Sequence, residues 1–304
     1  MTTQQNQPSQ NQAATAAAIR SADQLAVRRA RTLGGVKSAL HGLGLVVVLF
    51  GTLFPFYWMV STSLKTTSQI TEKTPLVFFS ATFEHYRTIL GSQYNVGGSL
   101  VTSLIVALSA TVLAVLLGTP AAYALARFTF KRKDDLWFWF ISNRFMSPVV
   151  IILPVYLLAS QLKLIGNPGL LIVMYLTFSI PVVVWICTDQ FRSIPRELDE
   201  AAMVDGASPG FIFLRIALPL ALPGVVVSSI LSFIFSWNEL LFALFLTRGD
   251  GVTAPVRATN FLSGYDVPWG EIMATGTLIV LPVIIFSLLV SRHLVQGLTM
   301  GAIK

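Results

Sequence analysis

One segment of the sequence fits the Gly-x-Ser-x-Gly spacing of a nucleophile elbow, at Gly206–Gly210. In that elbow the residue after the serine donates its backbone N–H to an oxyanion, but here the residue is Pro209, which has no N–H. No strand-like segment precedes the motif, and the only later histidine, His293, has no clear acidic partner. We therefore expect no serine nucleophile here and no catalytic residues on this chain.

Two further kinds of chemistry are also disfavoured. The chain contains no Gly-x-x-x-x-Gly-Lys-Ser/Thr sequence, so it should not bind ATP through a P-loop. Its three histidines are far apart, and its single cysteine, Cys187, lies inside an apolar run where cysteine acts as a small hydrophobic residue. We expect neither a metal site nor a cofactor on this chain.

Five polar or aromatic residues interrupt apolar stretches and are candidates for contact with a solute. They are Asn143, Arg144, Trp237, Asn238 and Glu239. Amide and carboxylate groups can bond hydroxyls, an indole can stack on a sugar ring, and a guanidinium matches anionic groups. Two alternatives stay open: Asn238 and Glu239 hold helices together, or Glu239 pairs with Arg144. An intramembrane enzyme would need paired catalytic groups, and Arg144 with Glu239 is the only such pair apparent.

The elements that must position these residues are long apolar runs. The 304-residue chain is 54% hydrophobic and 12% charged, and its charges cluster between runs long enough to cross a bilayer as helices. The sequence thus predicts an all-α polytopic membrane protein with six transmembrane helices, at about Leu40–Val60, Leu100–Ala126, Trp137–Leu158, Gly169–Cys187, Ile216–Leu246 and Ile272–Val290. The fifth run is too long for one straight crossing, and Pro219 and Pro223 are expected to mark where the chain turns into the membrane.

The distribution of basic residues predicts the orientation of these helices. A cytoplasmic N-terminus places fourteen of the 21 Lys and Arg residues inside and six outside, as the positive-inside rule requires. Both termini are then cytoplasmic, and the long outer segments are about 61–97 and 247–271. The net charge of +7 does not indicate nucleic-acid binding, because the basic residues form no continuous face.

The longest inner loop, at about 191–215, has the signals of a helix–turn–helix on the cytoplasmic surface. Ser193 is expected to cap a first helix, whose acidic first turns suit the helix dipole. Gly206 suits a left-handed helix end, and Ser208 before Pro209 restarts a helix. The alanines between these signals leave a small-residue surface that another protein can approach closely.

The spacing in this loop resembles a known family. Glu-Ala-Ala, three residues, Gly, nine residues and Ile-x-Leu-Pro is the loop pattern of bacterial ATP-binding-cassette import permeases. It is met at Glu200, Ala201, Ala202, Gly206, Ile216, Leu218 and Pro219, and Asp205 lies within it. The resemblance implies that the loop forms a coupling helix which docks on a separate ATPase subunit; the alternative is an ordinary amphipathic interface helix.

Further segments resemble the sugar-uptake branch of that family, the branch of the maltose-importer permeases. They are FPFYWMVSTSLK at Phe54–Lys65, Ser103–Phe130, Pro154–Pro181, FSWNELLFAL at Phe235–Leu244 and the ending QGLTMGAIK at Gln296–Lys304. The Gln-rich start resembles nothing recognised. Three parts are expected: a basic, disordered segment over 1–37, a six-helix permease domain over 38–295 and a cytoplasmic tail over 296–304.

The resemblance implies a permease subunit in the bacterial inner membrane that imports a sugar or sugar-like solute by alternating access. Its partners would be a second permease, two ATPase subunits that carry ATP and Mg, an extracytoplasmic solute-binding protein that meets the second outer loop, and membrane lipid. Two other transport functions remain as alternatives: an importer of phosphate, peptides or metals, and an ion-driven secondary transporter, which needs no ATPase-docking loop.

Overall fold

The computed structural model describes residues 41–74, 76–262 and 267–299, without the side chains of 144, 145 and 289–299. The chain divides into two units, residues 1–58 and 59–304. The predicted N-terminal segment 1–37 and the last residues of the predicted tail lie outside the described residues. The boundary predicted at 295 falls inside the last helix, which continues to Thr299.

In the described residues the fold is helical and contains no strand. Five helices are long and apolar enough to cross a membrane. They include His41–Ser63, Val96–Arg127 (α4), Pro168–Ser193 (α7), Pro209–Trp237 and the first part of Trp269–Thr299 (α13). The all-α membrane fold predicted from the sequence is therefore confirmed.

The third predicted span is broken. It consists of two helices, α5 (Lys133–Phe145) and α6 (Pro148–Gln161). The axes of the two helices differ in direction by 87°. Met146 and Ser147 have extended backbones, because Pro148 disfavours a helical residue before it and has no N–H to continue the ladder. The count of spans reaches six only if this bent pair is taken as one.

The fifth predicted span also differs. The helix starts at Ser208–Pro209 and runs through α9 (Pro209–Ile212), a π-helical turn (η1, Phe213–Ala217) and α10 (Leu218–Trp237) as one candidate span. The helix is therefore continuous through Pro219 and Pro223, and the point at which it enters the membrane stays a prediction. The π turn comes directly before Pro219 and leaves room for the proline ring. In a regular α-helix this ring would clash with a backbone carbonyl group of the preceding turn. The span ends at Trp237, and a separate helix α11 covers Leu241–Leu246.

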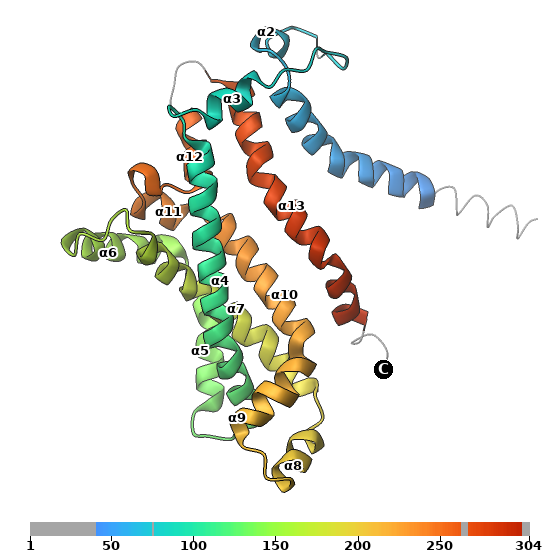
Figure 1. Cartoon of the computed structure of the whole chain (residues 1–304), viewed down its shortest axis with the longest axis vertical. Helices are drawn as coiled ribbons and strands as arrows, with labels where there is room; N and C mark the ends of the chain where they lie inside the picture. Colours follow the sequence, from blue (N-terminus) through green and yellow to red (C-terminus); the bar gives the residue numbers. More distant parts are fainter. Residues whose placement is uncertain (1–40, 75, 263–266, 300–304) are drawn as a thin grey trace, which may run out of the picture. The chain divides into compact units, whose positions relative to one another are not determined.

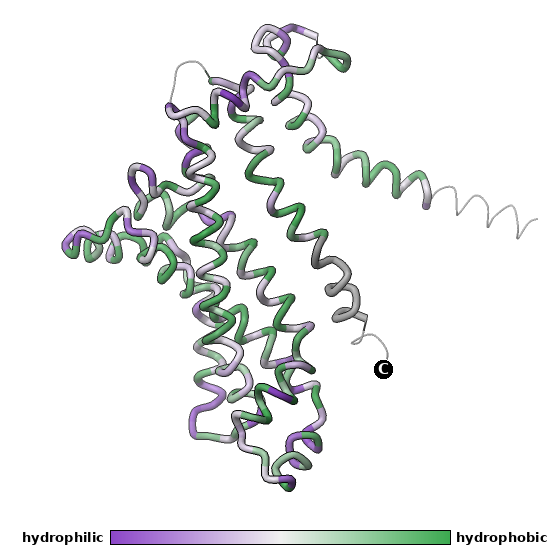
Figure 2. The backbone as a smooth tube through the Cα atoms, viewed as in Figure 1, coloured by the Kyte–Doolittle hydropathy of each residue, from purple (hydrophilic) through white to green (hydrophobic). Residues whose placement is uncertain are grey.

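Within residues 59–299, α4, α7 and α10 lie side by side and form the core, α13 contacts α10, and α5 contacts α7 (Figure 1). Small residues allow this close packing. A Cβ placed on Gly118 of α4 would lie 2.8 Å from Cγ1 of Val183 on α7. Figure 2 shows that residues along these helices are mostly hydrophobic and that hydrophilic residues gather at their ends.

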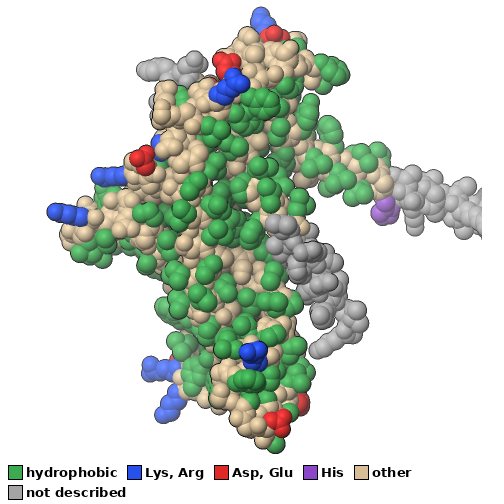
Figure 3. Space-filling view, in the orientation of Figure 1, with side chains coloured by type: hydrophobic (Ala, Val, Ile, Leu, Met, Phe, Trp, Pro, Cys, Tyr) green, Lys and Arg blue, Asp and Glu red, His purple; other side chains and the backbone are tan. Residues whose placement is uncertain are grey.

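The remaining short elements gather at the two ends of this bundle. One end holds α2 (Thr67–Ile70), α3 (Glu84–Leu90), η2 (Gly249–Gly251), α12 (Ala254–Thr259) and η3 (Asn260–Leu262). The other end holds α8 (Glu197–Val204), α9 and the loop between α4 and α5 (Figure 1). The face drawn in Figure 3 is mostly hydrophobic between the two ends, and charged side chains lie at both ends and on the part that projects to the left. The elements within the two long predicted outer segments thus lie at one end, and α8 and α9 of the predicted inner loop lie at the other.

Candidate functional site

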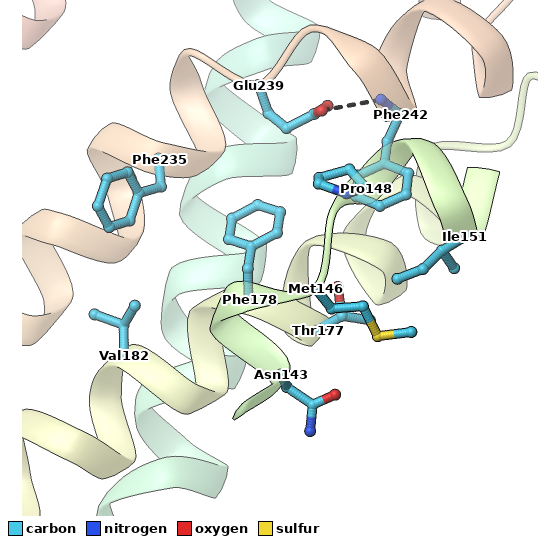
Figure 4. A pocket seen from close by; sticks show the side chains of 10 residues that line it. All are labelled: Asn143, Met146, Pro148, Ile151, Thr177, Phe178, Val182, Phe235, Glu239 and Phe242. Atoms are coloured by element: carbon cyan, nitrogen blue, oxygen red, sulfur yellow. Dashed lines mark hydrogen bonds between the residues drawn. The ribbon is translucent and has the colours of Figure 1, made fainter. Parts of the chain in front are cut away.

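A pocket of about 350 Å³ lies among the bent pair α5–α6, α7, and the junction of α10 with α11 (Figure 4). Its lining is mostly apolar, with three phenylalanines and three polar residues. The lining residues are Asn143, Met146, Pro148, Ile151, Thr177, Phe178, Val182, Phe235, Glu239 and Phe242. An apolar pocket with a few polar groups is typical of a site for an organic solute.

Glu239 lies in the break between α10 and α11. Its carboxylate oxygens accept hydrogen bonds from the backbone N–H groups of Phe242, at 2.9 Å, and Ala243, at 3.2 Å (Figure 4). These N–H groups belong to the first turn of α11 and would otherwise have no partner in that helix. Glu239 therefore fixes the start of α11 while its side chain lines the pocket.

Asn143 lies in the last turn of α5, across the pocket from Glu239 (Figure 4). Its side-chain Nδ2 donates to the carbonyl of Trp139 at 2.9 Å. Thr177 of α7 similarly bonds the carbonyl of Met174 within its own helix, at 2.6 Å. These local bonds hold two polar side chains at the pocket wall.

Two of the other candidates for solute contact, Trp237 and Asn238, are not among the lining residues. Trp237 is 2% exposed, donates from its indole N–H to the carbonyl of Ile279 at 3.0 Å and stacks on Phe233. Asn238 is exposed and donates to the carbonyl of Ile234 in its own helix. The side chain of Arg144 lies outside the described residues, so its pairing with Glu239 stays a prediction.

The inner loop has the local geometry of a sharply ended helix. Gly206 has φ of +85°, and its N–H bonds the carbonyl of Met203 at 3.0 Å, while the N–H of Ala207 bonds that of Ala202 at 2.9 Å. This pair of bonds is the Schellman helix ending, which the sequence indicated at this glycine. Ser208 caps the next helix, with its hydroxyl accepting from the N–H of Phe211 at 3.3 Å.

The start of α8 differs from the sequence-based expectation. Ser193 does not cap it but ends α7 and donates to the carbonyl of Gln190; α8 begins at Glu197. Glu200, Ala201, Asp205 and Gly206 are exposed and Ala202 is half-buried, whereas Ile216, Leu218 and Pro219 belong to the π turn and the start of α10.

An ion pair that the sequence did not suggest attaches α8 to the end of α4. Nε of Arg127 lies 2.7 Å from Oδ2 of Asp199, and the two side chains are 6% and 10% exposed. Arg127 also donates to the carbonyl of Ile194 at 3.0 Å, and Arg196 donates to that of Ala126 at 3.4 Å. Because burial of a charge requires a partner, this contact is a specific link between the loop and the membrane helix.

Comparison with known proteins decides the family. Residues 114–300 match the family described as "Binding-protein-dependent transport system inner membrane component". The chain belongs to this family. It is 38% identical over 276 residues to the "Trehalose transport system permease protein SugB" of Mycobacterium tuberculosis, covering 89% of this chain and 99% of that one. It is 30% identical over 272 residues to the "Trehalose/maltose transport system permease protein MalG" of Thermococcus litoralis, covering 88% and 98%.

The fold of this permease is also that of a solved transporter. A chain in the crystal structure of a bacterial ABC transporter involved in the import of the acidic polysaccharide alginate matches with a TM-score of 0.71 and 21% identity, covering 86% of the permease and 96% of that chain. The transmembrane transport subunit predicted from the sequence is thus confirmed.

Sequence reasoning missed two features of the permease. The apolar wall of the pocket, including Phe178, Phe235 and Phe242, looked like ordinary membrane-helix sequence. Arg127 was only one of the fourteen basic residues expected inside, and Asp199 only one of the acidic residues expected in the first turns of the loop helix. Their pairing was signalled only by their charge in a chain with few charges.

Proposed function

We propose that this permease imports a sugar or sugar-like solute, and that the pocket at Glu239 and Asn143 is part of the path. The observation that carries the proposal is the pocket's composition. Three aromatic rings can cover the apolar face of a sugar, while Asn143, Thr177 and Glu239 can bond hydroxyls. The names of the relatives, which refer to trehalose and maltose, support the same solute class.

The polar groups of the described lining suit hydroxyl groups. Asn143, Thr177 and Glu239 together offer hydrogen-bond donors and acceptors, and a hydroxyl group can both donate and accept.

The inner end of the bundle is proposed to dock on a separate ATPase, and the outer end to receive a solute-binding protein. Around the exposed Glu200, α8 and α9 present Leu198, Met203, Val204 and Phe211, and Val204 is 87% exposed. Such a patch on a charged loop is typical of a protein interface. The family's own description, as binding-protein-dependent, supports the outer partner. A second permease would complete the channel.

We propose the orientation that the distribution of basic residues predicts. Arg127, the basic residues at 131–133 and α8 belong to the proposed cytoplasmic end, together with both termini. With Cys187 replaced by serine, single cysteines at Glu72 and Asp250 should react with an impermeant thiol reagent in intact cells. Cysteines at Lys131 and Val204 should react only after permeabilisation. Labelling of the second pair in intact cells would contradict the orientation.

The function is tested by uptake in the native host after deletion of the gene for this chain. Uptake of labelled trehalose or maltose should fall to background and return with the wild-type gene, while labelled phosphate uptake stays unchanged. A loss confined to phosphate, or no loss for any of a wider panel of mono- and disaccharides, would refute the sugar assignment.

A further inference from the structure

The helix α4 is a continuous element that reaches from the inner loop to the outer one. It contains 32 residues, which corresponds to about 48 Å at the rise of an α-helix. By contrast, the chain of α10 breaks at Asn238–Leu240 before it reaches α11 and α12. Pro120 inside α4 removes one helical hydrogen bond, but the close packing of α4 along α7, with Gly118 against Val183, limits independent bending of this helix.

At its inner end, α4 is attached to α8 by the ion pair of Arg127, its last residue, with Asp199. Aromatic rings in edge-on and tilted contact pack beside this attachment. Tyr123 of α4 lies with ring centroids 5.3 Å from Phe191 of α7 and 5.1 Å from Phe213 of the π turn. A displacement of α8 therefore acts on α4 through a buried, charge-assisted contact.

At its outer end, α4 is attached to α12 by two hydroxyls from its first two turns. Ser103 accepts a hydrogen bond from the backbone N–H of Ala254 at 2.8 Å, and Ser99 accepts one from Nε of Arg257 at 3.0 Å. Arg257 also donates to the carbonyl of Gly249 at 3.2 Å, which ties in the preceding 3-10 turn. Both serines are buried, so water cannot readily replace these bonds.

We propose that Arg127 and Arg257 are positioning residues that clamp the two ends of α4, so that movement of α8 reaches α12 through this helix. The proposal rests on the proposed function, because it assumes an ATPase at α8. Rigid elements joined by specific polar contacts are the physical means by which distant sites become coupled. Docking of a partner at either end does not require such a connection, which here runs through α4 and its two attachments.

The test uses the permease in lipid nanodiscs, purified with its co-expressed partner subunits. Hydrogen exchange of α8 and of residues 249–262 is compared without nucleotide and with ATP, Mg²⁺ and orthovanadate. In the wild type, the exchange rates of both regions should change when the nucleotide is added. The Asp199→Asn variant should purify with the same subunits and show the same change in α8. The exchange rate of 249–262 in this variant should no longer change. A Ser99→Ala, Ser103→Ala double variant, which removes only hydroxyls, should lose the change in 249–262 as well.

Matched controls separate this role from general damage. Asp189→Asn makes the same change at the same end, in an exposed ion pair where Asp189 is 59% exposed and Arg192 is 44% exposed. Thr102→Val removes a hydroxyl that bonds the carbonyl of Gly98 within α4 itself. Both controls should respond like the wild type.

Three results would overturn the proposal. The first is a wild-type response of 249–262 in Asp199→Asn or, where that variant fails to assemble, in the double serine variant. The second is a response confined to α8 in the wild type. The third, purification of the wild type without any ATPase, would refute the proposed function itself, and it is visible before any variant is made.

Discussion

Replacement of Gly206 by alanine should loosen the end of α8 by a calculable amount. Gly206 has φ of +85°, and a Cβ added there would meet no atom within 4 Å. The cost is therefore conformational and not steric, at roughly 1–2 kcal/mol for an L-residue in the left-handed region. Such a cost lowers the ratio of the native helix ending to the opened one by a factor of about 5–30.

The amide of Ala207 reports on this ending, because its N–H bonds the carbonyl of Ala202 across the turn. We expect its hydrogen exchange in Gly206→Ala to accelerate about 5–30-fold, following the opening equilibrium. Gly206→Asn should have a smaller effect, since asparagine tolerates this conformation. In Gly206→Val the β-branched side chain should abolish uptake while the chain still inserts into the membrane.

Gly210 provides the matched control for this prediction. It is equally open, with no atom within 4 Å of an added Cβ, but it lies in a helix and its φ is not positive. Gly210→Ala should leave the exchange of Ala207 unchanged or slow it, because alanine favours helix by about 1 kcal/mol. Equal exchange at Ala207 in Gly206→Ala and the wild type would refute the reasoning.

Three further predictions concern the pocket, the exposed loop and the contact between α4 and α7. Glu239→Ala should reduce uptake more than Asn238→Ala, because it removes a pocket group and a helix cap worth about 0.5–2 kcal/mol; equal uptake in the two variants would contradict this. Glu200→Lys should release the ATPase or its stimulation, by reversing a charge at an interface where a buried ionic contact is worth about 2–5 kcal/mol; full subunit recovery with normal stimulated hydrolysis would exclude it. Gly118→Ala should destabilise the permease by about 1–3 kcal/mol through overlap with Val183, seen as a lower thermal unfolding midpoint in detergent, and an unchanged midpoint would show that the helices separate freely.

Local signals were sufficient for part of the fold. The apolar runs predicted membrane helices because a bilayer accepts no unpaired backbone groups. The left-handed Gly206 and the cap at Ser208 depend on a few neighbouring residues, and both have the geometry expected of them. The break in the third span also had a local signal, Ser147–Pro148, whose effect on the preceding backbone was not used in the prediction.

The sequence alone therefore determined that this is a helical membrane protein with a sharply ended helix in the loop at 191–215, because hydropathy and helix ends are short-range properties. Only the tertiary structure decided which polar residues meet. It placed Glu239 and Asn143 at one pocket but buried Trp237 against α13, although Trp237 and Glu239 are two residues apart. It also joined Arg127 to Asp199 across 72 positions of sequence. Such pairings depend on how helices rotate and cross when their side chains interlock, which no single helix encodes.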